Sequence, residues 1–580
     1  MEIIANLVDV ANNRISPSII SIENDKIKKI DQTEQPCSNY ILPPFVDSHI
    51  HIESSMLVPS EFARIASIHG TVAVVSDPHE IANVLGIEGI RFFIENANSN
   101  NLKNKMKFFF GVPSCVPATD FETSGAKITP NDVRILFDEE RLTYLGEMMN
   151  FPGVINDVPD VIEKIRIARD RGKVVDGHCP RLTKDDLQKY ISAGISTDHE
   201  CTNLDEATEK IQLGMKIQIR NGSSAKDFDN LFPLIDRFSD AVMFASDDLH
   251  TSDLLNGHIN LLVKKAVSQG ANLMNVLKAA SLNPINHYKL DVGKLQVGDD
   301  ADFVIVDNLK DFNILQTYCC GKIIAENGKT FIEQIPIKIV NNFKARFAEV
   351  VPQAIAVKLK QDSDTANDAK STITSANIIT NDVIVNIIEA QNGLLVTERS
   401  KEKLEINHNE IQASKEKDIL KLVVLNRYEE NAKPSVAFVR GFGITNGAIA
   451  TSIAHDSHNI IAVGSDDESI CNVMNAIIFE KGGIAVYSKE LLPYSDKLQK
   501  SVLNVLPLPV AGLMSDMDAN FVARENLILE KAVKNIGTKL DSPFMTLSFM
   551  ALLVIPKLKL SDKGLFNVET FSFEDLIVTD

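Results

Sequence analysis

The most informative stretch of the chain is ILPPFVDSHIH at positions 41–51, in which an apolar run leads into two histidines two positions apart. Side chains two apart on a strand point to the same face. If residues 41–46 form a barrel strand, His49 and His51 both reach one metal ion at its C-terminal end, where the active sites of barrel enzymes lie. A His-x-His pair alone occurs by chance in many proteins, so its meaning depends on the sequence around it.

Seven further apolar runs follow, with room for a helix between one and the next. This alternation is typical of repeated βα units and a parallel sheet, and eight such units fit a closed barrel of ordinary size. We therefore predict a (β/α)8 barrel over residues 41–285. Its eight predicted strands are 41–46, 71–76, 107–112, 142–147, 173–176, 194–197, 215–220 and 241–245.

Sequence of β character flanks the predicted barrel on both sides. Residues 1–40 and 286–345 are both predicted to supply short strands, which join in a small β-sandwich. A stretch rich in Asp, Ser, Thr, Ala and Lys at 360–375 lies inside a predicted linker at 346–377. Residues 378–580 are predicted to form a C-terminal domain of mixed α/β character.

The composition is that of an ordinary globular protein, with 44% hydrophobic residues among 580. The formal net charge of −19 argues against binding nucleic acid or an anionic membrane surface. The seven cysteines include no CxxC pair, which favours a reducing compartment, and the N-terminus lacks the apolar core of a signal peptide. We expect a cytoplasmic protein without a membrane span, acting on a small molecule as a homodimer.

Metal-ligand side chains follow three more of the predicted strands. His178 comes after the fifth strand, His199 after the sixth and Asp247 after the eighth. Neutral imidazole and carboxylate suit Zn, Mn or Fe. Because ligand types occupy four strand ends at once, we predict a metal site at the barrel mouth rather than a set of unrelated structural histidines.

Glu147 closes the fourth predicted strand inside an otherwise apolar run. An unpaired carboxylate would be costly to bury there. Coordination removes that cost, and an ion pair with a neighbouring Arg or Lys is the alternative. We interpret Glu147 as the bridge to a second metal.

Three ionisable residues, Asp77, His79 and Glu80, follow the second predicted strand. They suit a further metal contact, a proton shuttle or a substrate contact, and the alternative is a helix N-terminus with acidic residues in its first turn. Arg220 and Ser223 follow the seventh strand, where substrate contacts and ordinary loop chemistry are equally good interpretations.

A second group of histidines lies far along the chain, where His455, Asp456 and His458 precede an apolar run at 460–463. They fit a separate metal site, a polar β-turn, or a cap that the C-terminal domain places over the barrel mouth. We favour the cap, with His455 and His458 helping to enclose the substrate.

The ligand pattern on strands one, four, five, six and eight resembles the amidohydrolase superfamily. Longer motifs resemble one branch of it, the bacterial adenine deaminase family, and the similarity covers nearly the whole chain. These motifs are PFVDSHIHIESSM (44–56), DPHEIANV (77–84), DGHCP (176–180), IAHDSHN (453–459) and PFMTLSF (543–549). The resemblance implies hydrolysis of adenine to hypoxanthine and ammonia at a binuclear manganese or iron centre.

Chemical roles can be assigned to the predicted residues. Bound metal lowers the pKa of water from about 16 towards 7, giving a hydroxide to attack C6 of the purine. Asp247 is the candidate to hold metal and accept the hydroxide proton, with Asp248 as the fallback, and Glu80 or His79 would shuttle a proton to the ring. The metal ligands are predicted to be His49, His51, Glu147, His178, His199 and Asp247, with His199 also a candidate to polarise the substrate. The predicted substrate contacts are Asp77, Arg220, Ser223, Asp248, His455 and His458.

Two competing functions remain. A cyclic-amide hydrolase of the dihydropyrimidinase kind usually carries a carboxylated lysine on the fourth strand, where this chain has Glu147. A barrel that lost catalysis and serves as an interaction protein would be expected to lack ligands, and this set looks whole.

Overall fold

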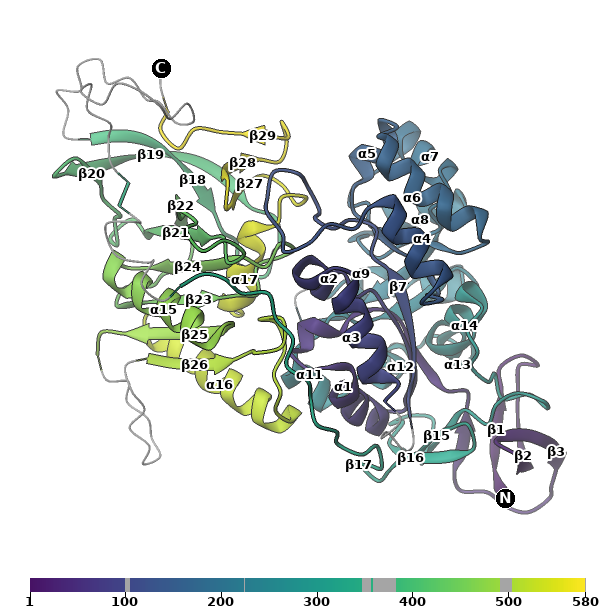
Figure 1. The fold of residues 1–580 in the computed structure, drawn as a ribbon. Coiled ribbons are helices and arrows are strands. Elements are labelled where there is room, and N and C mark those ends of the chain that lie inside the picture. The colour runs from purple at the N-terminus through teal and green to yellow at the C-terminus, as the bar shows by residue number, and fades with distance from the viewer. Residues whose placement is uncertain (100–104, 224, 347–355, 358–381, 491–502, 579–580) are drawn as a thin grey trace.

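A ring of parallel strands forms the centre of the protein, which we describe from a computed structural model (Figure 1). The structure describes residues 1–99, 105–223, 225–346, 356–357, 382–490 and 503–578. The predicted linker core at 360–375 therefore lies outside the described residues. Among the described residues, no helix is long and apolar enough to cross a membrane.

The predicted (β/α)8 barrel is confirmed. Ser196 N donates to Val175 O at 3.0 Å, and this hydrogen bond joins the fifth strand to the sixth. Ser48 Oγ donates to Phe244 O at 2.8 Å, which joins the eighth strand to the first and closes the ring. A two-residue strand, β13, continues past the eighth and pairs with the first. The barrel strands are β5 (Phe45–His51), β6 (Thr71–Ser76), β7 (Lys107–Val112), β8 (Tyr144–Met148), β9 (Val175–Gly177), β10 (Thr197–Asp198), β11 (Lys216–Arg220), β12 (Val242–Ala245) and β13 (Asp247–Asp248).

The first barrel strand differs from the prediction of residues 41–46. Tyr40–Leu42 (β4) belongs to a different sheet, and the barrel strand β5 starts only at Phe45. The reason is Pro43-Pro44, because proline has no N–H to donate to a strand ladder and so separates two strands that look continuous in sequence. His49 and His51 consequently lie within β5, not beyond it.

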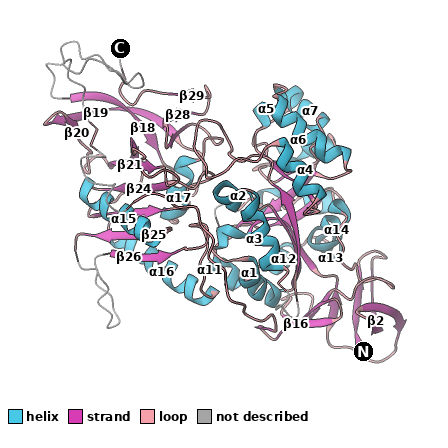
Figure 2. Cartoon of the chain, viewed as in Figure 1, coloured by secondary structure: helices cyan, strands magenta, loops and turns pink. Residues whose placement is uncertain are grey.

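Helices surround the barrel, coloured cyan in Figure 2. Their apolar faces, together with the outward faces of the strands, fill two large clusters of buried side chains. The helices are α1 (Pro59–Ala66), α2 (His79–Leu85), α3 (Ile87–Ala97), α4 (Pro130–Asp138), α5 (Phe151–Ile155), α6 (Pro159–Asp170), α7 (Lys184–Ser192), α8 (Leu204–Gln212), α9 (Phe228–Leu231), α10 (Leu234–Arg237), α11 (Thr251–Asn256), α12 (Ile259–Ser268), α13 (Leu273–Leu277) and α14 (Asn283–Tyr288).

Strands that precede and follow the barrel in the sequence form one eight-stranded sheet, which lies near the N-terminus marked in Figure 1. The parallel pairing of β1 with β4, and the antiparallel pairing of β14 with β4, join the two ends of the chain segment. The order is β17-β16-β15-β14-β4-β1-β2-β3, formed by β1 (Glu2–Asp9), β2 (Arg14–Glu23), β3 (Lys26–Gln32), β4 (Tyr40–Leu42), β14 (Phe303–Val306), β15 (Ile314–Cys319), β16 (Lys322–Glu326) and β17 (Lys329–Thr330).

A nine-stranded sheet forms the C-terminal part, on the opposite side of the barrel (Figure 1). Its order is β20-β19-β18-β22-β21-β24-β23-β25-β26, from β18 (Asp382–Glu389), β19 (Glu398–Asn407), β20 (Glu410–Ile411), β21 (Ile419–Leu425), β22 (Ser435–Arg440), β23 (Gly447–Thr451), β24 (Ile460–Gly464), β25 (Gly483–Ser488) and β26 (Leu503–Pro507). Helices α15 (Asp467–Glu480), α16 (Ala519–Asn535) and α17 (Pro543–Ser548) accompany it, with a small sheet of β27 (Leu558–Ser561), β28 (Gly564–Asn567) and β29 (Ser572–Phe573).

Both faces of this larger sheet are buried at β21, whose seven residues are all buried and, apart from Lys421, apolar. Val423 and Leu425 pack in a cluster with α15. Leu422 and Val424, on the other face, belong to the same cluster as barrel residues such as Ile81. Since one apolar core runs from the barrel into the C-terminal part, the two are held together at the barrel mouth.

Candidate metal centre

His49 and His51 lie side by side on β5, with their Nε2 atoms 3.2 Å apart and both side chains buried. His51 Nδ1 lies 3.1 Å from the backbone carbonyl of Asp77. A carbonyl can only accept, so Nδ1 carries a proton, and in the neutral form of the ring Nε2 would offer its lone pair to the site. A backbone partner of this kind is typical of a metal-binding histidine.

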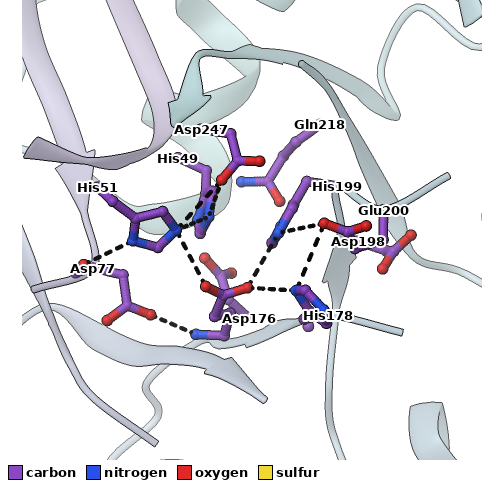
Figure 3. Close-up of polar contacts among 12 residues, drawn as sticks. His49, His51, Asp77, Asp176, His178, Asp198, His199, Glu200, Gln218 and Asp247 are labelled. Carbon is purple, nitrogen blue, oxygen red and sulfur yellow. Dashed lines mark hydrogen bonds and ion pairs between the residues drawn. The ribbon is translucent and has the colours of Figure 1, made fainter. Parts of the chain in front are cut away.

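Glu147 contacts three of the histidines that Figure 3 labels, namely His51, His178 and His199. Its Oε1 is 3.2 Å from His51 Nε2, whereas its Oε2 is 3.1 Å from His199 Nε2 and 2.8 Å from His178 Nδ1. The two oxygens of one carboxylate therefore face different histidines. This is the arrangement expected of a ligand that bridges two ions.

Asp247 completes the cluster on the side of β5. Its Oδ1 lies 3.4 Å from His51 Nε2 and 3.7 Å from His49 Nε2. The residue has φ of +58°, a left-handed conformation that Asp adopts more readily than most residues and that often occurs at functional sites. The structure thus brings all six predicted ligands together.

The donor set fits divalent metal ions. His49, His51 and Asp247 offer ligand atoms within 4.8 Å of one another, and so do His49, Glu147 and His199. These groups are buried, and lone pairs aimed at one another repel unless a proton or a cation lies between them. Imidazole and carboxylate together suit transition metals such as manganese, iron or zinc.

Gly146 makes room for the residue that positions Glu147. The Asp77 carboxylate accepts a hydrogen bond from Glu147 N at 2.8 Å through Oδ2. A Cβ at position 146 would lie 2.2 Å from that oxygen, so no larger residue fits without displacing Asp77. Asp77, predicted as a substrate contact, thus holds the backbone of Glu147.

Arg220, also predicted as a substrate contact, is surrounded by carboxylates. Its guanidinium donates to Asp247 Oδ2 at 2.9 Å, Glu200 Oε2 at 3.0 Å and Asp227 Oδ2 at 2.9 Å. By holding the outer oxygen of Asp247, it leaves Oδ1 facing the histidines. These contacts favour a positioning role for Arg220.

Ser223 fixes the loop after β11. Its hydroxyl donates to Asp253 Oδ2 at 2.5 Å and accepts from His250 N at 2.8 Å, and its N–H donates to Asp248 O at 2.7 Å. The Asp248 carboxylate in turn accepts from Ser54 Oγ at 2.5 Å. Burial, followed by the charge of Asp247, raises the pKa of Asp248 above its usual value.

The C-terminal part contributes two histidines to the barrel mouth. His455 Nδ1 lies 2.7 Å from Glu80 Oε1, and His458 Nε2 contacts Glu80 Oε2. All three side chains are buried. Burial would raise the pKa of Glu80, but the neighbouring His455, His458 and His79 outweigh burial and hold it well below its usual range. Glu80 is therefore ionised at neutral pH.

His79 lies between this pair of histidines and the metal ligands. Its Nε2 is 3.6 Å from Glu80 Oε1, and its Nδ1 is 3.6 Å from Glu147 Oε1. Asp456 Oδ1 lies 3.9 Å from His79 Nε2. The predicted shuttle candidates thus stand next to the ligand cluster, under the residues that the C-terminal part supplies.

A cavity of about 700 Å³ lies between the barrel mouth and the C-terminal part. Glu200, Arg220 and Ser223 line it from the barrel, and Leu395 and Met545 from the other side. Glu200 Oε1 is 3.7 Å from His178 Nδ1 and 3.6 Å from His199 Nε2. The cavity therefore reaches to within one side chain of the ligand cluster.

Two acidic residues near the site were not assigned a role from the sequence. Glu53 is buried and accepts from Ile81 N at 3.0 Å, which fixes the helix that carries Glu80. Glu200 pairs with Arg220 beside the ligands. In the sequence, the two residues stand out only by their positions near ligand histidines: Glu53 follows His51-Ile52, and Glu200 follows His199. This position alone does not assign a role, because carboxylates in such positions are equally common on protein surfaces.

Comparisons with known proteins agree with this geometry. Residues 40–324 match the family model described as "Amidohydrolase family", and residues 394–572 match "Adenine deaminase C-terminal domain". The chain is 48% identical to an adenine deaminase of Methanosarcina mazei over 580 residues, covering 99% of each chain. The chain belongs to the adenine deaminase family.

Other members of the adenine deaminase family are similarly close. The chain is 47% identical over 576 residues to the enzyme named adenine deaminase in Sulfurovum sp., and 43% identical over 578 residues to the one in Borreliella burgdorferi. These matches cover 98–99% of each chain. Divalent metal is general in the amidohydrolase family, in agreement with the donor set described above.

Proposed function

We propose that this protein deaminates adenine hydrolytically, giving hypoxanthine and ammonia, as part of purine salvage. The observation that carries the proposal is the bridging position of Glu147 between two sets of histidines, in a chain that belongs to the adenine deaminase family. A glutamate rather than a lysine at this position disfavours the alternative of a cyclic-amide hydrolase.

We propose a binuclear centre that holds Mn²⁺ or Fe²⁺. His49, His51 and Asp247 would hold one ion, His178 and His199 the other, and Glu147 would bridge them. A pair of divalent ions supplies Lewis acidity, which lets water act as a nucleophile at neutral pH. A homodimer and a cytoplasmic location stay predictions, and light scattering of the purified protein tests the first.

The chain's own acids and bases then move the protons. Water attacks C6, where a C–O bond forms and the bond to the amino nitrogen breaks. One proton of the water goes to a ring nitrogen, and the other leaves with ammonia. Asp247, beside the ligand histidines, is positioned to accept the proton of the attacking water. Glu80, ionised and next to His79, can accept a proton and deliver it to the purine ring.

Burial of these groups supports the same chemistry. The side chains of Glu80, Asp248 and His455 are all buried. Among buried groups, a charge or hydrogen bond aimed at the reacting ring acts more strongly than it would in bulk solvent.

A direct assay tests the proposal. The protein purified without metal and loaded with Mn²⁺ or Fe²⁺ is expected to convert adenine to hypoxanthine, followed by ultraviolet absorbance with ammonia release in parallel. Metal-free protein is expected to be inactive, and added metal should restore turnover. Absence of ammonia release with either metal would contradict the proposal.

The pairing of His458 with Glu80 predicts a role for the C-terminal part in turnover. We expect His458→Ala to lower kcat/KM about 10- to 100-fold, since leaving a buried charge without one of its partners costs about 1.5–3 kcal/mol. His408→Ala, in an exposed turn of the same part of the chain, is the matched control and should leave kcat/KM unchanged. Equal kinetic constants for His458→Ala and the wild type would exclude this role.

A further inference from the structure

Lys210 is a fully buried lysine on α8, outside the ligand cluster. Its three ammonium protons have three acceptors: Cys179 O at 2.8 Å, Asp198 Oδ2 at 3.0 Å and Glu206 Oε1 at 2.7 Å. A buried ammonium is stable only when it is paired and hydrogen-bonded in this way. The three acceptors around Lys210 therefore match a charged ammonium group.

Two of these acceptors adjoin ligand histidines in sequence. Cys179 directly follows His178, and Asp198 directly precedes His199. The two segments are also tied to each other, because Asp198 Oδ1 accepts from Cys179 N at 2.9 Å. One ammonium thus links the two strand ends that bear His178 and His199, through the backbone carbonyl of Cys179 and the carboxylate of Asp198.

The remaining contacts anchor the same network to the helix layer. Glu206 Oε1 also accepts from Arg181 N at 2.9 Å. Asp198 Oδ2 additionally accepts from Cys201 Sγ at 3.1 Å. Both segments are thereby held on their outer side, away from the ligand atoms.

The other side of the cluster is held independently. His51 is oriented by the carbonyl of Asp77, and Asp247 by Arg220. Neither contact involves Lys210. A change at position 210 therefore acts on one half of the cluster.

We propose that Lys210 is a positioning residue for one of the two metal positions, the one formed by His178 and His199. This inference rests on the proposed two-metal centre. Partners behind a metal ligand typically change metal affinity 10- to 100-fold when they are removed. Loss of Lys210 leaves the position at His49 and His51 occupied and weakens the other.

Metal titration of Lys210→Met tests the proposal, since methionine keeps most of the side-chain volume without the charge. The probe is Mn²⁺ added to metal-free protein, with free Mn²⁺ read by electron paramagnetic resonance. The wild type is expected to bind two ions, and Lys210→Met to bind one with unchanged affinity and the second 10- to 100-fold more weakly. Anomalous diffraction at the manganese edge then shows which position lost occupancy.

Lys107 provides the matched control. It too donates to one carbonyl and two carboxylates, namely Asp291 O at 2.8 Å, Asp300 Oδ2 at 2.8 Å and Asp302 Oδ2 at 2.7 Å. It joins the barrel to the β-sheet formed by both chain flanks, away from the ligands. Lys107→Met should bind two ions as the wild type does, even if its Tm falls.

The outcomes separate the two proposals. Equal weakening of both ions in Lys210→Met, or no weakening of either, overturns the role of Lys210. A wild type that binds fewer than two ions contradicts the two-metal centre itself, and this inference with it. If Lys210→Met does not fold, Asp198→Asn removes the charge while it keeps an acceptor for Cys179 N, and it should weaken the same position.

Discussion

Glu147→Gln is expected to lower the rate of adenine deamination by at least about 10³-fold. The loss of several kcal/mol of metal-derived stabilisation corresponds to that factor, since each 1.4 kcal/mol is tenfold. Glutamine keeps the shape of the side chain but replaces one oxygen with an amide that carries two protons. It can therefore face His51 or the pair His178 and His199 as an acceptor, but not both. Bridging is lost whichever way the amide turns.

Metal content should fall together with the rate. We expect Glu147→Gln to retain fewer than two ions per chain after dialysis, measured by atomic absorption. Glu61→Gln is the control, because Glu61 is a buried glutamate of α1 that pairs with Arg64 outside the ligand cluster. It should keep both ions and full activity. A Glu147→Gln variant with two ions and wild-type turnover would show that the bridge assignment is wrong.

Most of the barrel strands and the metal ligands can be predicted from local patterns in the sequence. An apolar run followed by His or Asp marks a strand and the group at its end, so His178, His199 and Asp247 could be assigned without any long-range information. The start of β5 was wrong by four residues because the run 41–46 crosses two prolines without losing its apolar character. Hydrophobicity alone does not show which sheet a short strand joins.

Roles that depend on a partner could not be predicted in this way. Arg220 meets Glu200 and Asp247 only because neighbouring barrel strands bring their ends together. Lys210 meets Asp198 because helix α8 packs back against the strand end that bears Asp198. The contact between Glu80 and His455 joins residues 375 positions apart. The sequence suggested a cap from the C-terminal domain, but the particular carboxylate that the cap holds depends on how two domains pack.

Glu80→Gln is expected to lower kcat about 10²- to 10⁴-fold, the range typical for loss of a general acid or base. The amide cannot take up a proton and deliver it to the purine ring. It does retain the size of the side chain and a donor and an acceptor for His455 and His458. Both metal ions should therefore remain bound, in contrast to Glu147→Gln, and metal analysis with steady-state kinetics distinguishes the two variants.

His79→Asn separates Glu80 from the other shuttle candidate. His79 lies 3.6 Å from both Glu80 and Glu147, so its loss perturbs two charged neighbours without removing a carboxylate. If Glu80 moves the proton, Glu80→Gln reduces kcat more than His79→Asn does, and its residual rate depends less on pH because the titrating group is gone. A larger loss in His79→Asn, with Glu80→Gln close to the wild type, would transfer the shuttle to the imidazole. In that case the contacts of His455 and His458 with Glu80 would serve to hold the domains together rather than to tune a catalytic carboxylate.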